Sequence, residues 1–321
     1  MKIFIVGATG FIGSHLVDHL NSVGISPFCM VRTEPKWIRG KNYTCVKCSD
    51  FSGEHISKLL GEAEYIFYLG GVTKASSYEE YVKGNHSAFV EFYEKLKSCG
   101  KNCKWLCYIS TMAVNAPNPD GSPITEDSPL NPVSHYGKSK ALNEEYLAGK
   151  KDFPVLVVRL PGVYGPRDLD FLEYFKTVQK GFAPVFGKKP ETSLIYAGDI
   201  AEALFAAMKK GLSGTYYISD GRTYTYGDIA REARKLLNKK AVYVKIPIIL
   251  AKIFAHLSER IKVRNIVNEQ KVMEISAGSW LCSNAKILSA LPEWRPKVFM
   301  PEGFRMTVDW YIQNGYLEKG V

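Results

Sequence analysis

The sequence has no apolar run long enough to cross a lipid bilayer, and its first residues carry no export signal. Its most apolar stretch, Ile246 to Leu257, contains Pro247, Lys252 and His256 and is shorter than the about 20 residues that a membrane span needs. Met1 to Val6 run straight into a glycine loop, without the apolar core and cleavage site of a secretory signal. We therefore expect a cytoplasmic protein without stable membrane association.

Cysteines and clustered charges are too sparse to indicate a disulfide framework, a metal site or a nucleic-acid surface. Seven cysteines at irregular spacing fit reduced thiols, and the lone CxxC of Cys45 and Cys48 lacks the further ligands of a zinc site. The formal net charge is +10, but the Lys and Arg residues are scattered singly or in pairs such as Lys150-Lys151. We expect no metal and no nucleic acid, and some positive potential that attracts an anionic cofactor.

Short strand-like runs alternate with helical stretches through the first two-thirds of the 321 residues. Several of the runs are continuously apolar, as parallel strands covered on both faces are. This alternation predicts an α/β fold with a doubly wound parallel sheet, a Rossmann fold. The predicted strands are Ile3–Val6, Pro27–Val31, Tyr43–Lys47, Tyr65–Leu69, Trp105–Ile109 and Val155–Val158, and the main helices are Phe11–Asn21, Tyr78–Ser98 and Tyr136–Ala148.

After about Pro161 the alternation loosens, which indicates a smaller C-terminal α/β domain. We expect residues 1–160 to form a dinucleotide-binding domain and residues 161–321 to form mainly a substrate domain, with residues 192–212 returning to the first. The elements predicted in this part are the strands Tyr216–Ser219 and Val242–Lys245 and the helices Tyr226–Leu237 and Gly303–Tyr311.

A glycine-rich loop, Gly7-Ala8-Thr9-Gly10-Phe11-Ile12-Gly13, follows the first predicted strand and opens the first helix. Gly7 permits a tight turn, Gly10 lets backbone approach a pyrophosphate, and Gly13 lets the helix pack closely on the strand. The free N–H groups of the helix N-terminus then face the phosphates. We therefore expect a dinucleotide cofactor that contacts Gly7, Thr9, Gly10, Phe11, Ile12 and Gly13.

The end of the second predicted strand should read the adenosine ribose of that cofactor. An acidic residue there accepts from the 2′-hydroxyl of NAD, whereas an arginine accommodates the 2′-phosphate of NADP. Arg32 follows the strand directly and Glu34 comes two residues later. We predict NADP, with NAD as the second choice, and we expect Asp50 and Phe51 to clamp the adenine ring.

Tyr136 and Lys140 stand four residues apart in a predicted helix, so their side chains share one face. A free phenol has a pKa of about 10, too high for proton transfer at neutral pH. An ammonium held nearby favours the phenolate, so we predict that Lys140 lowers the pKa of Tyr136. The preceding strand ends in Ser110 and Thr111, where a hydroxyl can hold a substrate oxygen at the carboxyl edge of the sheet.

These three signals, in this order, resemble the extended short-chain dehydrogenase/reductases of the NAD-dependent epimerase/dehydratase type. The resemblance continues through Pro161-Gly162-Val163-Tyr164-Gly165-Pro166, Gly198 to Ala203 and the ending from Glu302-Gly303 to Trp310-Tyr311. It implies a catalytic set of Thr111, Tyr136 and Lys140, of which Lys140 also hydrogen-bonds the nicotinamide ribose. It also assigns further residues to the cofactor site, namely Leu69, Gly70, Gly71, Asn85, Ser110, Pro161 and Val163.

Departures from the family pattern narrow the chemistry that the resemblance implies. Met112 and Ala113 stand where sugar-nucleotide dehydratases carry acidic residues, and Gly162 stands where many epimerases carry an asparagine that contacts the substrate diphosphate. Val31-Arg32, Pro161-Gly162 and Trp280-x-Cys282 look more like hydroxysteroid dehydrogenase and dihydroflavonol reductase relatives. We predict an oxidoreductase acting on a secondary alcohol or ketone. The alternatives are a sugar-nucleotide epimerase with retained cofactor and a non-catalytic NADP-sensing protein.

Several other features admit two interpretations. His135 either tunes the pKa of Tyr136 or is an ordinary loop histidine. Ile246–Ile261 either packs as a helix of the small domain or touches lipid. The helices Tyr78–Ser98 and Tyr136–Ala148 are candidates for a homodimer interface, because the first carries more apolar surface than one sheet face needs. Five aromatic residues line either an apolar substrate pocket or the core of the second domain, namely Phe186, Tyr196, Tyr224, Tyr226 and Trp280.

Overall fold

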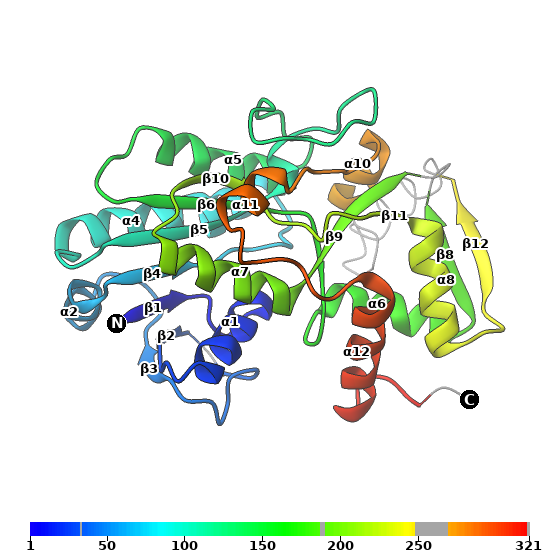
Figure 1. Ribbon diagram of the computed structural model, residues 1–321, viewed down its shortest axis with the longest axis horizontal. Coiled ribbons are helices and arrows are strands. Elements are labelled where there is room, and N and C mark those ends of the chain that lie inside the picture. Colours follow the sequence, from blue (N-terminus) through cyan, green and yellow to red (C-terminus); the bar gives the residue numbers. More distant parts are fainter. Residues whose placement is uncertain (33, 187–189, 248–268, 320–321) are drawn as a thin grey trace.

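The structure, a computed structural model, describes residues 1–32, 34–186, 190–247 and 269–319. Seven parallel strands form its main sheet in the order β10-β6-β5-β4-β1-β2-β3 (Figure 1). The order reverses between β1 and β4, which places a ligand crevice outside the carboxyl ends of these strands. The predicted doubly wound sheet is confirmed. Its strands are β1 (Ile3–Val6), β2 (Phe28–Val31), β3 (Thr44–Lys47), β4 (Tyr65–Tyr68), β5 (Trp105–Thr111), β6 (Val155–Leu160) and β10 (Gly214–Tyr217).

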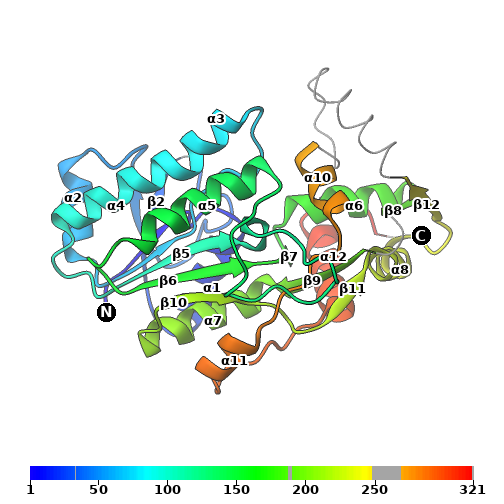
Figure 2. The ribbon, with the colours of Figure 1, turned by 90° about the horizontal axis from the view of Figure 1, so that it is seen from above.

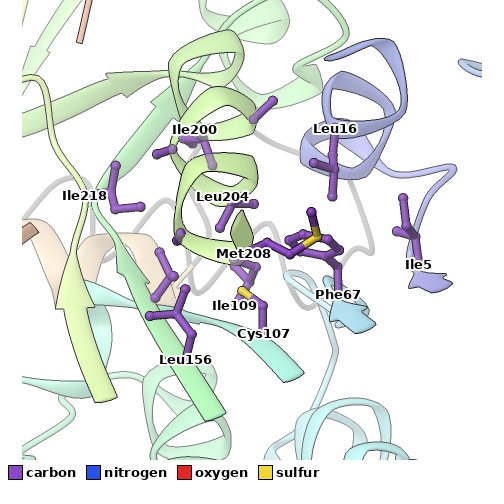
Figure 3. Close-up of a cluster of buried hydrophobic side chains, with 14 of the residues drawn as sticks. Ile5, Leu16, Phe67, Cys107, Ile109, Leu156, Ile200, Leu204, Met208 and Ile218 are labelled. Carbon is purple, nitrogen blue, oxygen red and sulfur yellow. The ribbon is translucent and has the colours of Figure 1, made fainter. Parts of the chain in front are cut away.

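Helices cover both faces of this sheet because successive strand residues point to opposite sides and both sets are apolar. On one face, Ile5, Phe67 and Ile109 pack against Leu16 of α1 and Leu204 of α7 (Figure 3). The other face packs against the helices on the opposite side (Figure 2). The helices of the first face are α1 (Phe11–Ser22), α7 (Ala197–Lys210) and α11 (Ala285–Ala290), and those of the second are α2 (Glu54–Glu62), α4 (Ala88–Cys99) and α5 (His135–Ala148).

The predicted helix from Tyr78 to Ser98 is interrupted. It consists of α3 (Tyr78–Tyr81), a π-helical segment η1 (Val82–Ser87) and α4. Its apolar residues are not surplus, because Tyr81, Phe89, Phe92 and Leu96 are each no more than 1% exposed within the single chain. The apolar surface on which the homodimer prediction rested is therefore used inside the core, and that argument was wrong.

A second layer of structure stands beyond the carboxyl edge of the main sheet. It contains a three-stranded sheet in the order β11-β9-β7 and a two-stranded parallel sheet of β8 and β12. Its apolar core includes side chains from three of the four helices named below, α10 being the exception. The strands are β7 (Gly162–Tyr164), β8 (Phe182–Phe186), β9 (Glu191–Tyr196), β11 (Thr223–Thr225) and β12 (Val242–Ile246), and the helices are α6 (Leu169–Gln179), α8 (Tyr226–Leu237), α10 (Glu269–Ala277) and α12 (Met300–Gln313).

The chain crosses between the two parts more than once. Within residues 192–212, β9 belongs to the three-stranded sheet, whereas α7 packs on the main sheet beside α1. The next strand, β10, then pairs with β6 at the edge of the main sheet. In the described part of the chain, no helix has the length and apolarity of a membrane span. The stretch predicted at Ile246–Ile261 lies outside the described residues from residue 248 onward.

Candidate active site

The turn from β1 into α1 has the geometry of a dinucleotide-binding loop. Gly7 has a φ of 85°, and a Cβ on Gly13 would lie 2.1 Å from the Gly7 carbonyl oxygen, so neither position accepts a side chain. No described side chain caps the N-terminus of α1, and its first turn holds no acidic residue. The N–H groups there thus remain available to an anion. This cradle fits the pyrophosphate of a nicotinamide dinucleotide.

Asn85 fixes the loop after β4 against α5. Its Oδ1 accepts from the Val72 N–H at 2.7 Å, and its Nδ2 donates to the Val72 carbonyl at 3.0 Å and to the Ser139 hydroxyl at 2.9 Å. A Cβ on Gly71 would lie 3.0 Å from that Oδ1, so the loop passes close to the amide. Asn85 lies in the π-helical segment, a feature that often marks functional sites. Leu69, Gly70 and Gly71 are held at the crevice through this amide.

The two hydroxyls at the end of β5, those of Ser110 and Thr111, point to different partners. The Ser110 hydroxyl donates to Glu144 Oε1 at 2.5 Å, and the residue is 2% exposed. Thr111 instead reaches the phenol of Tyr136, whose pKa its side chain lowers. Since neighbouring strand residues point to opposite faces, one hydroxyl supports α5 from the core while the other reaches the crevice. The cofactor contact predicted for Ser110 does not use its hydroxyl in this arrangement.

Tyr136 stands in the first turn of α5, partly exposed at the crevice. Its ring centroid lies 6.2 Å from that of Tyr81. Burial raises the pKa of Tyr136 above its ordinary value, the charges of Glu274 and Tyr81 raise it further, and the side chains of Thr111 and Lys271 lower it. The predicted lowering of this pKa by Lys140 is not observed, because desolvation outweighs the favourable interactions.

Lys140 lies deeper than Tyr136 on the same helix face. It is 4% exposed, and its Nζ stands 4.4 Å from the centroid of the Tyr108 ring. Burial lowers the pKa of Lys140 to about 7, although the Glu144 carboxylate acts in the opposite direction. A Cβ on Gly71 would lie 3.8 Å from this Nζ, so the amine borders the loop after β4. Lys140 is therefore a crevice amine that titrates near neutral pH.

Helix α10 of the C-terminal part docks on the first turn of α5. Glu274 Oε1 accepts from the Ser134 hydroxyl at 3.0 Å, and Gln270 Oε1 accepts from the His135 N–H at 2.6 Å. Ser134 is also the N-cap of α5, where its hydroxyl accepts from the Gly137 N–H. These contacts join residues at least 135 positions apart, and sequence reasoning missed both Gln270 and Glu274 because no local motif marks them.

His135 directly precedes Tyr136 but faces another aromatic ring. Its ring centroid lies 5.4 Å from that of Tyr78, and its Nδ1 lies 3.4 Å from Gln270 Nε2. The geometry thus favours a histidine that packs at the start of α5 over one that tunes the phenol.

The residues predicted to read the adenosine end lie after β2 and β3. Arg32 is exposed, and the nearby Glu34 is already paired with Arg39, Oε2 to Nη2, at 2.5 Å. Asp50 is exposed and accepts from the N–H and the hydroxyl of Ser52. Phe51 is 6% exposed and packs edge-on against Phe92 in the core. The predicted adenine clamp therefore has no Phe51 ring at the surface.

The segment after β6 borders the crevice on the side of the C-terminal part. Pro161 is partly buried, and Val163 packs against the core beneath α1 and α7. A Cβ on Gly162 would lie 2.7 Å from Leu194 Cδ2, so the space beside β7 is already filled by that leucine. An asparagine at this position would require Leu194 to move.

Three of the five aromatic candidates for a substrate pocket lie in cores. Tyr196 and Tyr224 belong to the core of the C-terminal part, and Trp280 packs in a small cluster with Met112. Each of these aromatics is 6% or 7% exposed. Tyr226 is partly buried, within electrostatic range of Glu274, and the Phe186 side chain lies outside the described part. All seven cysteines are free, and the described residues include no group suited to a metal ion.

Comparisons with known proteins agree with this geometry. Residues 3–219 match the model of the NAD dependent epimerase/dehydratase family. The chain is 26% identical over 326 residues to ceramide reductase of Caulobacter vibrioides, covering 99% of this chain and 96% of that protein. It is 25% identical over 346 residues to dTDP-D-glucose 4,6-dehydratase of Homo sapiens, covering 100% and 92%. A structure of UDP-glucuronic acid 4-epimerase from Bacillus cereus in complex with NAD has a TM-score of 0.79 at 20% identity, covering 99% of this chain and 100% of that chain, which indicates a shared fold.

Proposed function

Because this chain belongs to the NAD-dependent epimerase/dehydratase family, we propose that it is a nicotinamide-dependent oxidoreductase that transfers a hydride at a secondary alcohol or ketone. The family match bears out the resemblance seen in the glycine loop, the Ser-Thr strand end and the Tyr136–Lys140 pair. It makes the chain an enzyme of the short-chain dehydrogenase/reductase type.

The observation that carries the proposal is the placement of Thr111, at the carboxyl edge of the sheet, close enough to the Tyr136 phenol to lower its pKa, with Lys140 one turn further along α5. The raised pKa keeps the Tyr136 phenol protonated at neutral pH, so it is ready to donate its proton to a carbonyl oxygen that becomes a hydroxyl. Thr111 holds the same oxygen in line with the phenol. Lys140, with a pKa of about 7, can hold or release a proton behind Tyr136. A bound nicotinamide supplies or accepts the hydride.

Two features favour net oxidation or reduction over epimerisation and dehydration. Leu194 fills the space beside Gly162, where epimerases of the family carry the asparagine for a substrate diphosphate. Met112, at the position of the acidic residue of dehydratases, is 5% exposed and packs with Trp280. The similarity to a ceramide reductase over nearly the whole chain also fits a ketone-reducing activity. A non-catalytic sensor would not need the Thr111–Tyr136–Lys140 arrangement.

Substitution of Tyr136 tests this role. We expect Tyr136→Phe to lower kcat by two or more orders of magnitude, about the contribution of a positioned acid, while the affinity for nicotinamide dinucleotide stays within about twofold. The matched control is Tyr146→Phe on the outer part of the same helix, whose hydroxyl contacts Glu94. Turnover of an identified ketone substrate by Tyr136→Phe at the native rate would refute the assignment.

For the cofactor itself we propose NADP, although the solved relative above was crystallised with NAD. Support comes from Arg32, which is exposed directly after β2, while the competing Glu34 is paired with Arg39. A charge-assisted contact to the 2′-phosphate contributes about 1.5–3 kcal/mol, so we expect Arg32→Ala to weaken NADPH binding roughly ten- to a hundredfold and to leave NADH binding nearly unchanged. Tighter binding of NADH than of NADPH by the native protein would instead assign the ribose contact to Glu34.

A further inference from the structure

The small parallel sheet of β8 and β12 has one apolar face that no described element covers. In its register Phe182 pairs with Val242 and Pro184 with Val244, so these four side chains share one face. The opposite face carries Ala183, which is 0% exposed and lies in the core shared with α6 and α8. In Figure 1, α8 lies on the inner side of the two strands and β12 forms the outer edge of the molecule.

The exposure of this face is unusual for the molecule. Phe182 is 56% exposed, Val242 is 64% exposed and Val244 is 36% exposed, and these three residues are a third of the nine large apolar residues that are exposed in the described part. All the others, except Tyr243 of the same strand, are scattered over other elements. Single exposed apolar residues are ordinary, but apolar residues gathered on one face mark an interaction surface.

Positive charges surround this apolar face. Lys180 lies in the turn before β8, and Lys239 and Lys240 lie in the turn before β12. The two turns are joined by the hydrogen bond from the Val242 N–H to the Gly181 carbonyl at 2.8 Å, so the three lysines gather at one end of the sheet. None of these three lysines forms an ion pair with another described residue. The nearby Glu173 and Glu232 are paired with Lys176 and Lys235.

We propose that this face, formed by Phe182, Pro184, Val242 and Val244 with Lys180, Lys239 and Lys240 at one end, docks on lipid bilayers that contain anionic lipids. Apolar side chains flanked by cations suit the boundary between acyl chains and negative headgroups. A second copy of the chain is a poorer occupant, because pairing two such faces would bring six ammonium groups without a described ion-pair partner together on molecules of net charge +10.

The proposed docking on bilayers differs from the expectation drawn from the sequence, which was that the protein has no stable membrane association. Peripheral docking needs no membrane-spanning helix, so the finding that none occurs in the described residues does not bear on it. The face of β8 and β12 is a different surface from the crevice of Tyr136, so its docking on a membrane does not depend on the proposed reaction.

The test is co-sedimentation of the full-length protein with vesicles of phosphatidylcholine, with and without phosphatidylglycerol. We expect binding only to the anionic vesicles, weakened by added salt. Each lysine near an anionic surface contributes about fivefold in affinity, so Lys239→Gln with Lys240→Gln should weaken binding on the order of 25-fold. Phe182→Ser with Val242→Ser should weaken it at least tenfold. The control, Val23→Ser with Met306→Ser, removes residues that are 46% and 40% exposed elsewhere and should bind like the native protein.

Four results would overturn the proposal. The first is no binding of the native protein to anionic vesicles. The second is an equal loss of binding in the Val23 and Met306 control. The third is a marked fall in Tm for Phe182→Ser with Val242→Ser without any change in vesicle binding, which would mean that another segment of the chain covers the face. Dissociation of a native dimer by the same substitutions, again with unchanged vesicle binding, would assign the face to a second copy.

Discussion

Lys140 shows how burial changes the chemistry of a single residue in this protein. Its amine is 4% exposed and faces the Tyr108 ring and the loop after β4. The Glu144 carboxylate lies on its own helix but does not offset the cost of removing the ammonium from water, so the pKa falls to about 7. A lysine that is kept in such a place at the expense of stability is typical of a functional site.

We predict that replacing Lys140 stabilises the protein in a pH-dependent way. The folded pKa of about 7 lies below the ordinary value of 10.5, so between these pH values the unfolded chain binds the proton more tightly. The cost of Lys140 is therefore complete below pH 7 and disappears as the pH rises toward 10.5. Lys140→Met should raise the free energy of unfolding by on the order of a few kcal/mol at pH 6 and much less at pH 10.

Urea unfolding at both pH values measures this effect. The matched control is Lys138→Met, which removes an exposed lysine from the same helix and should change stability little at either pH. A gain for Lys140→Met that is equal at pH 6 and pH 10 would contradict the titration of Lys140 and indicate only improved packing.

Glu274 is a residue whose charge reaches the phenol of Tyr136 from another part of the chain. Tyr136 is faced by Glu274 and Lys271 of α10, Tyr81 of α3 and Thr111 of β5. The carboxylate raises the pKa of the phenol, so Glu274→Gln should lower that pKa. In alcohol oxidation the phenolate accepts the proton, and we expect the pH–rate profile of this direction to shift to lower pH. Glu145→Gln, on the exposed face of α5, is the control, and an unshifted profile for Glu274→Gln would refute the effect.

At the scale of elements, α5 carries a polar stripe of Tyr136, Lys140 and Glu144 at intervals of one turn. The buried end of the stripe is a bidentate ion pair, in which Arg159 of β6 donates through Nε to Glu144 Oε1 at 3.2 Å and through Nη2 to Glu144 Oε2 at 2.7 Å. Ser110 of β5 donates to the same carboxylate. This network anchors α5 on two strands, β5 and β6.

We predict that breaking this ion pair destabilises the fold strongly. Glu144→Gln leaves the guanidinium of Arg159 buried without a counter-charge, which costs about 3–5 kcal/mol in comparable pairs. Glu173→Gln breaks the exposed pair with Lys176, where both side chains are more than a third exposed, and should cost about 0–1 kcal/mol. Urea unfolding measures the free energy of unfolding of both variants. A similar decrease in both would show that the buried ion pair stabilises the fold no more than the exposed one.

At the scale of the whole molecule, the boundary suggested at residue 160 does not separate two independent cores. Ile200 and Leu204 of α7 cover the face of the main sheet that includes Ile109 and Leu156 (Figure 3). The edge strand β10 pairs with β6 from residue 214 onward. A fragment of residues 1–160 would leave this apolar face open to water.

We therefore expect fragment 1–160 to lack a cooperative unfolding transition in urea when followed by circular dichroism. The exposed strand edge and apolar face also predict aggregation. A fragment of residues 1–219, which restores α7 and β10, should regain a cooperative transition. A sharp transition in fragment 1–160 alone would show that the first 160 residues form a complete domain.

The sequence by itself determined the features that are encoded within one element or one turn. The apolar runs of the strands, the helical repeats and the three glycines of the first loop predicted the Rossmann sheet and its phosphate cradle. The Tyr136–Lys140 spacing predicted a shared helix face. Ser110 and Thr111 point to opposite faces of the sheet because side chains alternate along a strand, although the prediction assigned both hydroxyls to the crevice. Such patterns are readable because their periods are properties of the backbone.

Only the tertiary structure decided the features that depend on distant neighbours. The Phe51 ring is in the core because Phe92 packs on it, and the apolar face of α4 is filled by its own sheet. The pKa of Tyr136 rises because the effects of burial and of Glu274, 138 positions away in the chain, outweigh the lowering of the pKa by Thr111. Desolvation and charge depend on what folding places nearby, and no local spacing in the sequence records it.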